Sequence, residues 1–157
     1  MEVIITTLDR QDRAILRALQ KDGRLSIQDL SEQVNLSASP CSRRIKRLEE
    51  TGVILGYKAH LDERKTGAGF SVFVSVRLDR QVDEALQAFE AAIASYDEVV
   101  DCWLMTGQQD YLMRVAVADL DEFETFLTGR LTKLSSVAAI ESSIPIRAVK
   151  KGFSRAP

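Results

Sequence analysis

Residues 30–50 read LSEQVNLSASPCSRRIKRLEE, and this stretch predicts the turn and second helix of a helix-turn-helix. Ser37 is a residue type that caps helices, and Pro40 suits a first helical turn, where its missing N–H would have no partner in any case. An apolar stripe then repeats at helical spacing, at Cys41, Ile45 and Leu48. We therefore expect a helix that packs on its own domain through this stripe.

The opposite face of the same helix is basic. At about 100° per residue, Arg43, Lys46 and Arg47 point away from the apolar stripe. In a helix-turn-helix this side meets phosphates and base edges in the major groove. The pattern favours double-stranded DNA as the partner, and the candidate DNA-binding residues are Ser37, Ser39, Ser42, Arg43, Lys46 and Arg47.

Two questions about this face stay open at the level of sequence. A run of charges on a helix is often just a solvated face, although the capped turn before this run favours DNA. Arg44 lies nearer the buried flank, so it either contacts DNA or pairs with an acid such as Glu32 or Asp29.

Length and charge limit the alternatives. With 157 residues and 45% hydrophobic content, the chain is long enough for one ordinary domain or two small ones. The net charge of −2 is unevenly distributed, because residues 1–65 carry 12 Lys and Arg against 10 Asp and Glu, and the rest carry 9 against 13. We expect DNA contact only in the first part, and we do not expect a globally basic, non-specific coat.

The sequence offers little for metal, redox or catalytic chemistry. Cys41 and Cys102 belong to no CxxC pair, and His60 is the single histidine, so we expect neither a metal site nor a cofactor. Both cysteines are expected to be small core residues, with redox sensing as the minor alternative. No Ser/His/Asp or Cys/His set can be placed, which argues against an enzyme. No segment approaches the roughly 20 apolar residues of a membrane helix, and we expect a cytoplasmic protein.

The first domain is expected to span residues 1–61. A helix over 8–21 is predicted to start at Asp9 with support from Asp12, and a second helix to follow a Ser26 cap. Gly52 stands where a left-handed conformation commonly ends a helix. Residues 53–61 alternate in character and predict a short strand or wing. The polar, glycine-containing segment 62–69 is expected to be a hinge or linker.

Residues 70–157 are expected to form a second domain of alternating strands and helices. The hydrophobic periodicities predict strands over 70–78, 99–106, 111–118 and 137–145 and helices over 83–94 and 120–134. The order βαββαβ is that of a ferredoxin-like α+β fold, in which two helices cover one face of the sheet. The strands look largely apolar on both faces, so we expect a second copy of the chain to cover the other face.

With these elements in place, the chain resembles the leucine-responsive regulatory protein/AsnC (feast/famine) family of transcription regulators. The resemblance rests on residues 8–16, 36–49 and 52–54 and on the loop Gly107-Gln108-Gln109-Asp110-Tyr111-Leu112. It implies a winged helix-turn-helix, a hinge and a RAM-type βαββαβ effector domain. It also implies dimers that assemble into tetramers, octamers or larger forms.

The resemblance further implies a small-molecule effector, usually an amino acid, bound between dimers beside the glycine-containing loop. Carried over to this chain, the effector-binding residues are Gly107, Gln108, Asp110 and Tyr111. Gly107 allows close approach of the backbone, and Asp110 offers a carboxylate either to a ligand ammonium or to the loop itself. This chain has Gln108 where relatives often have an acid, and Ser135-Ser136 where they tend to have Pro-Gly.

The sequence therefore predicts a sequence-specific DNA-binding transcription regulator that responds to an amino acid or a derivative. The alternative is an architectural protein of the same fold that bends or wraps DNA without an effector.

Overall fold

A computed structural model describes residues 7–150, 154 and 157 of the chain. These residues form two compact units: one runs up to His60 and includes Lys150, Ser154 and Pro157, and the other spans Leu61–Val149. The first six residues of the expected first domain lie outside the described part, as do residues 151–153 and 155–156 of the second.

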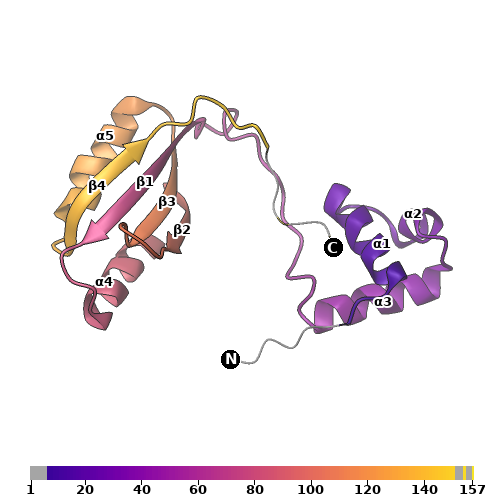
Figure 1. The fold of residues 1–157 in the computed structure, drawn as a ribbon. Helices are drawn as coiled ribbons and strands as arrows, with labels where there is room; N and C mark the ends of the chain where they lie inside the picture. Colours follow the sequence, from indigo (N-terminus) through magenta and orange to yellow (C-terminus); the bar gives the residue numbers. More distant parts are fainter. Residues whose placement is uncertain (1–6, 151–153, 155–156) are drawn as a thin grey trace. The chain divides into compact units, whose positions relative to one another are not determined.

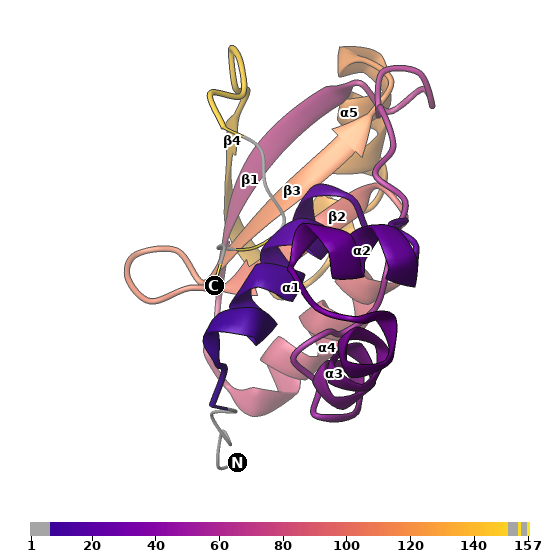
Figure 2. The same cartoon turned by 90° about the vertical axis from the view of Figure 1, so that its right-hand side faces the viewer.

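The first unit consists of three helices, drawn in indigo and violet in Figure 1 and from another side in Figure 2: α1 (Arg10–Lys21), α2 (Ile27–Gln33) and α3 (Ala38–Glu50). The predicted start of α1 is confirmed by a complete capping box. The Asp12 N–H donates to Asp9 Oδ1 over 2.8 Å, and the Asp9 N–H donates to Asp12 Oδ2 over 3.1 Å. Ser26 caps α2 through the Asp29 N–H, as its position predicts.

The core of the first unit is the apolar stripe of α3 packed against α1 and α2. Cys41, Ile45 and Leu48 are buried, as predicted, and their partners are Ile15, Leu16, Leu30 and Val34. The expectation that Cys41 is a small core residue is confirmed, since its side chain has no exposed surface.

The segment after α3 departs from the expectation. Gly52 has the predicted positive φ of 71°, but residues 53–61 form no strand, so the strand predicted there is wrong. In the described residues no other strand of this unit is present to pair with it, and an isolated strand is not stable. The segment is held to α3 instead: the Ile54 N–H donates to the Leu48 carbonyl, and the Tyr57 hydroxyl donates to Glu49 Oε1, each over 3.0 Å.

The second unit has the predicted βαββαβ order, which confirms the α+β fold class. Its strands are β1 (Phe70–Leu78), β2 (Val99–Leu104), β3 (Tyr111–Val117) and β4 (Val137–Ser143), and its helices are α4 (Asp83–Ala94) and α5 (Leu120–Gly129). The sheet is antiparallel with strand order β2-β3-β1-β4. The last predicted helix is shorter than expected because a 3-10 turn, η1 (Leu131–Lys133), replaces its final residues.

Both helices pack on one face of this sheet (Figure 1). Phe89 of α4 and Phe123 and Phe126 of α5 belong to one core with alternate residues of β1 and β3. The alternation of buried and less buried residues along β1 has the period of two that a strand with one covered face requires.

The open face of the sheet is more polar than predicted. Ser71, Ser75 and Arg77 of β1 point to it, because the alternate residues of that strand are buried in the core. Trp103 and Leu112, which are partners across β2 and β3, supply an apolar part. The expectation of two largely apolar faces is therefore wrong for β1, where two serines and an arginine share the open face with one apolar residue, Phe73.

The segment expected to be a linker is folded back on itself and tied to the second unit. The Asp62 carbonyl accepts from the Lys65 and Thr66 N–H groups, which makes a turn. Glu63 pairs with Arg114 of β3 over 2.9 Å, and Arg114 also lies 3.4 Å from Asp101. The residues before this turn, 55–60, are exposed, and Leu55 is 95% exposed.

Candidate functional site

The outer face of α3 carries all six residues predicted to bind DNA. Ser37, Ser39, Ser42, Arg43, Lys46 and Arg47 are exposed, and the buried stripe of the helix faces the core. Ser37 stands at the predicted N-cap position, but its hydroxyl makes no capping hydrogen bond. The N-cap and the first two turns of α3 therefore present three serine hydroxyls and Arg43 on an exposed surface.

The cations on this face differ in how firmly they are held. Within the described residues, no ion pair of Arg43 is present. Lys46 Nζ lies 3.7 Å from Glu50 Oε1, and both side chains are mostly exposed, so this pair contributes little to stability.

Arg44 and Arg47 converge on a single buried carboxylate. Asp12, which is only 1% exposed, accepts from Arg44 Nη1 over 2.8 Å and from Arg47 Nη2 over 2.5 Å, one arginine on each oxygen. Arg44 Nη1 also donates to Asp9 Oδ2 over 2.6 Å. The capping box of α1 is thereby joined to α3.

This network corrects the partners predicted for Arg44. Its acids are Asp9, the N-cap of α1, and Asp12 of α1, not Glu32 or Asp29 of α2. The N–H of Asp12 and then the Arg44 guanidinium lower the pKa of Asp9 to about 2, and the pKa of Arg44 is raised by Asp9 first and Asp12 second. The only signal in the sequence was the Asp9-Asp12 spacing, which sequence analysis assigned to capping alone.

The depressed pKa of Asp9 predicts how the first unit responds to acid. A carboxylate whose pKa falls from 3.8 to about 2 on folding adds stability above pH 3.8, and this stability is lost as the pH falls through 2. We expect Asp9→Asn to flatten the pH dependence of thermal unfolding in that window, followed by circular dichroism. Glu32→Gln, which changes an exposed acid of α2, is the control and should keep the wild-type pH dependence.

The loop between β2 and β3 holds three of the four predicted effector residues, and the fourth, Tyr111, begins β3. Gly107 has φ of 122°, a conformation that favours glycine, and no atom lies within 4 Å of where its Cβ would be. Gln108 is exposed beside it. The loop tip is therefore open to an approaching molecule.

Asp110 is a buried part of the loop, with both carboxylate oxygens occupied. Oδ2 accepts from the Leu78 N–H over 2.7 Å, and Oδ1 accepts from Gln81 Nε2 over 2.5 Å. Its backbone N–H donates to the Val76 carbonyl, and its carbonyl accepts from the Met105 N–H. The carboxylate thus joins the loop to the end of β1.

Tyr111 lies in the core, on the side of the sheet covered by helices. Its ring centroid is 4.5 Å from that of Phe89, and its hydroxyl donates to Glu90 Oε1 over 2.8 Å. Burial and then the Glu90 carboxylate raise the pKa of Tyr111. The structure therefore separates Tyr111 from the exposed tip of the loop.

A cavity of about 360 Å³ lies beside this loop. It is lined by Gln81, Leu86, Leu104, Met105, Thr106, Gly107 and Asp110. Sequence analysis found only Gly107 and Asp110 of this set. The others share no motif: Gln81 lies between β1 and α4, Leu86 on α4 and Leu104 at the end of β2, and Met105 and Thr106 open the loop. Next to Asp110, the buried Gln109 Oε1 has no hydrogen-bond partner among the described residues.

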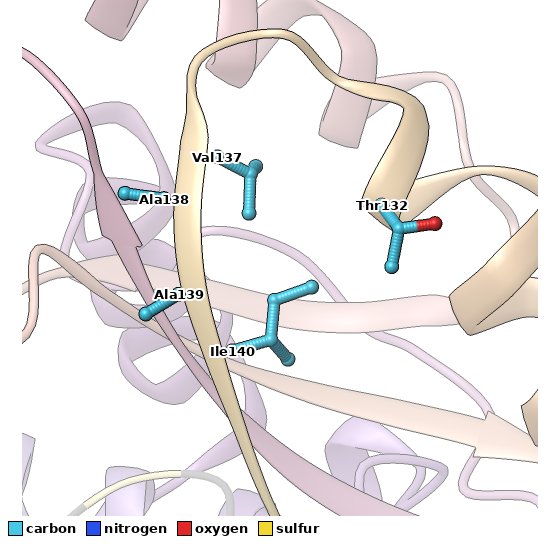
Figure 3. A pocket seen from close by; sticks show the side chains of 5 residues that line it. All are labelled: Thr132, Val137, Ala138, Ala139 and Ile140. Carbon is cyan, nitrogen blue, oxygen red and sulfur yellow. The ribbon is translucent and has the colours of Figure 1, made fainter.

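A second cavity, of about 290 Å³, lies between η1 and β4 (Figure 3). Its side chains are Thr132, Val137, Ala138, Ala139 and Ile140, so the Thr132 hydroxyl is their one polar group. Such a lining offers nothing to orient a charged ligand.

The remaining candidate chemistry is sparse in the part of the chain that the structure describes. No group of three or more His, Cys, Asp or Glu side chains is placed to hold a metal ion. No helix there has the length and apolar character needed to cross a membrane. The expectation that Cys102 is a core residue is wrong, because it is exposed on the edge strand β2; desolvation and the Glu90 carboxylate raise the pKa of its thiol to about 11.

Family comparisons match both units. Residues 8–54 match a winged helix-turn-helix DNA-binding family, and residues 71–154 match the Lrp/AsnC ligand binding domain. The Bkd operon transcriptional regulator of Pseudomonas aeruginosa is 47% identical over 142 residues, covering 90% of this chain and 93% of the relative.

Solved structures agree with these matches. A transcriptional regulator of Neisseria meningitidis, determined as a complex with L-methionine, has a TM-score of 0.91 and 36% identity and covers 95% of this chain and 96% of its own. An AsnC family transcriptional regulator of Agrobacterium tumefaciens has a TM-score of 0.89 and 36% identity, with coverage of 94% and 96%.

Proposed function

Because this chain belongs to the Lrp/AsnC family of transcription regulators, we propose that α3 reads an operator in double-stranded DNA and that the cavity beside Gly107 takes an amino-acid-like effector. The function is transcription regulation through DNA binding. The proposal assigns the chain no catalytic step, and a role on DNA is consistent with a cytoplasmic location.

The observation that carries the DNA part is the exposed face of α3. Ser39, Ser42 and Arg43 stand near the start of the helix, where helix-turn-helix proteins contact base edges. Lys46 and Arg47 stand further along, where phosphate contacts are expected. We propose these roles for the five residues, and we propose that Ser37, at the N-cap, also contacts the DNA.

Replacing Arg43 with alanine should weaken DNA binding strongly. The loss of one exposed cation that contacts bases or phosphates is expected to cost about 1–3 kcal/mol, and a phosphate role would also lower the slope of log affinity against log salt by about 1. Fluorescence anisotropy with a short duplex selected from a randomised library by the wild-type protein measures both.

Arg13→Ala is the matched control for this experiment. It removes the same charge from an exposed position of the same unit, on α1 rather than α3. Equal losses in the two variants would show that net charge, and not this face of α3, governs binding.

The effector part is carried by the cavity beside Gly107. Leu86, Leu104 and Met105 offer it an apolar wall, and the backbone around Gly107 offers polar groups. The similar regulator from Neisseria meningitidis was solved with L-methionine, which supports an amino acid with an apolar side chain. Asp110 would shape the loop, because its oxygens already accept hydrogen bonds from Leu78 and Gln81.

Thermal unfolding against the common amino acids and their main degradation products tests this site. A compound that binds the folded protein raises the unfolding midpoint by mass action. At a ligand concentration of a hundred times its Kd, the free energy of unfolding rises by about 2.7 kcal/mol. Leu104→Ala should abolish that shift while hardly changing the midpoint without ligand, because Leu104 is 61% exposed.

Leu120→Ala, at a 56% exposed position of α5, is the control and should keep the shift. A compound whose shift survives Leu104→Ala binds elsewhere. If no compound changes the midpoint, the alternative of an architectural protein without an effector is favoured.

Assembly and hinge position remain proposals. We propose a homodimer that forms tetramers or octamers, in which the Trp103–Leu112 part of the open sheet face is covered. The turn at 62–69 is tied to the second unit through Glu63 and Arg114, so we place the hinge in the exposed residues 55–60 instead.

A further inference from the structure

Asp12 is unusual because it is a buried carboxylate whose partners lie on the proposed DNA-binding helix. Its side chain is 1% exposed, and charges are buried at this depth only when they are paired. Arg44 alone would supply one partner. The second partner, Arg47, is drawn from the outer face of α3.

The two arginines are held differently. Arg44 is 28% exposed, and its Nη1 donates to both Asp9 and Asp12. Arg47 is 48% exposed, and the contacts of the described residues include one hydrogen bond for it, from Nη2 to Asp12 Oδ2. A guanidinium has five N–H donors in a rigid plane, so a single bond to Asp12 restrains one end of the group and leaves the other donors for a ligand.

This restraint matters for binding to a phosphate. A long side chain that is free in solution loses rotamer freedom when it is captured, at a cost of about two- to tenfold in affinity. Lys46, which is 75% exposed and only 3.7 Å from Glu50, must meet that cost on DNA. Arg47 has already lost part of its rotamer freedom in the folded protein, because Asp12 restrains its guanidinium.

We propose that Asp12 is a positioning residue of the DNA interface, which acts on DNA by holding the guanidinium of Arg47 in an orientation that offers its remaining N–H donors to a backbone phosphate. The inference rests on the proposed DNA-binding role of α3. It adds an acid of α1, which itself does not contact DNA, to the residues that determine affinity.

Net charge alone predicts the opposite change in DNA affinity when Asp12 is neutralised. DNA is a polyanion, so neutralising an acid near the interface should strengthen binding. The same is expected if Asp12 competes with DNA for Arg47. Under the positioning role, neutralising Asp12 weakens binding although the protein becomes more positive.

The test compares Asp12→Asn with Glu50→Gln in the full chain. Each variant removes one negative charge paired with a cation of α3, but only the first loosens Arg47. With the selected duplex described above, we expect Asp12→Asn to bind about fivefold more weakly and Glu50→Gln to bind as well as or better than the wild type. Tighter or unchanged binding by Asp12→Asn overturns the proposal.

Two further variants show whether Asp12 acts through Arg47. Adding Asp12→Asn to Arg47→Ala should cause little further loss, because the side chain that Asp12 orients is gone. An equal fivefold loss in that background would mean that Asp12 acts through general stability, which overturns the proposal. Circular dichroism confirms that each variant is folded at the binding temperature.

If Asp12→Asn does not fold, Arg47→Lys tests whether the orientation of the guanidinium determines DNA affinity. Lysine keeps the charge but lacks the planar fork, so positioning predicts that Arg47→Lys loses nearly as much affinity as Arg47→Ala. Retention of wild-type affinity would contradict it. Failure of this inference leaves the loss in Arg43→Ala intact, whereas failure of the proposed function removes that loss as well.

Discussion

Replacing Asp12 with alanine is expected to lower the free energy of unfolding of the first unit by about 3 kcal/mol. The change removes the acid that both Arg44 and Arg47 contact, and it also removes the acceptor of the Asp9 N–H at the start of α1. Breaking a buried ion pair costs about 3–5 kcal/mol. The low end applies here, because Arg44 and Arg47 are 28% and 48% exposed and can be rehydrated.

The position of the single tryptophan allows this loss to be assigned to one unit. Trp103 lies on β2, so its fluorescence reports the second unit, whereas far-UV circular dichroism reports the helices of both. Urea titration of Asp12→Ala should show an early dichroism transition and an unchanged fluorescence midpoint. Glu32→Ala, at an exposed acid of α2, should stay within about 0.5 kcal/mol of the wild type. A coincident shift of both signals would contradict the assignment to the first unit.

Replacing Asp110 with alanine is expected to destabilise the second unit by about 2 kcal/mol. The Leu78 N–H and the Gln81 amide lose their acceptor, and a buried donor without a partner costs about 1–3 kcal/mol. Here Trp103 fluorescence should shift to lower urea concentration. Glu124→Ala on α5, whose carboxylate is exposed, is the matched control and should leave the midpoint almost unchanged.

This expectation also changes what Asp110 can reveal about the effector. A variant that has lost the junction between the loop and β1 would lose effector binding whether or not the carboxylate contacts the ligand. An Asp110→Ala protein with wild-type stability and no effector response would contradict the structural role and favour direct contact with the ligand.

Local patterns in the sequence were sufficient for most of the secondary structure. The apolar stripe of α3, the capping box of α1 and the two-residue alternation of β1 are each set by neighbours within one or two turns or along one strand. The strand predicted over 53–61 was wrong because alternation is only a local pattern. A strand also needs a partner strand, and the described residues of its unit provide none.

The two candidate sites also differ in how far the sequence predicts them. The outer face of α3 could be predicted because a single helix fixes which residues lie together. The lining of the cavity could not, because Gln81, Leu86 and Leu104 come from three parts of the chain. Likewise, Tyr111 belongs to the loop in sequence, but the pleat of β3 turns its ring into the core.

The sequence by itself determined the family, the α+β fold, the order of the elements and the exposed side of α3 for which we propose DNA contact, since these depend on residue type and short-range spacing. Only the tertiary structure decided which charges meet. Asp12 and Arg47 are 35 residues apart in the chain, as are Asp9 and Arg44. The helix packing brings each pair within hydrogen-bond distance, and Coulomb attraction depends on separation in space, to which separation in sequence is no guide.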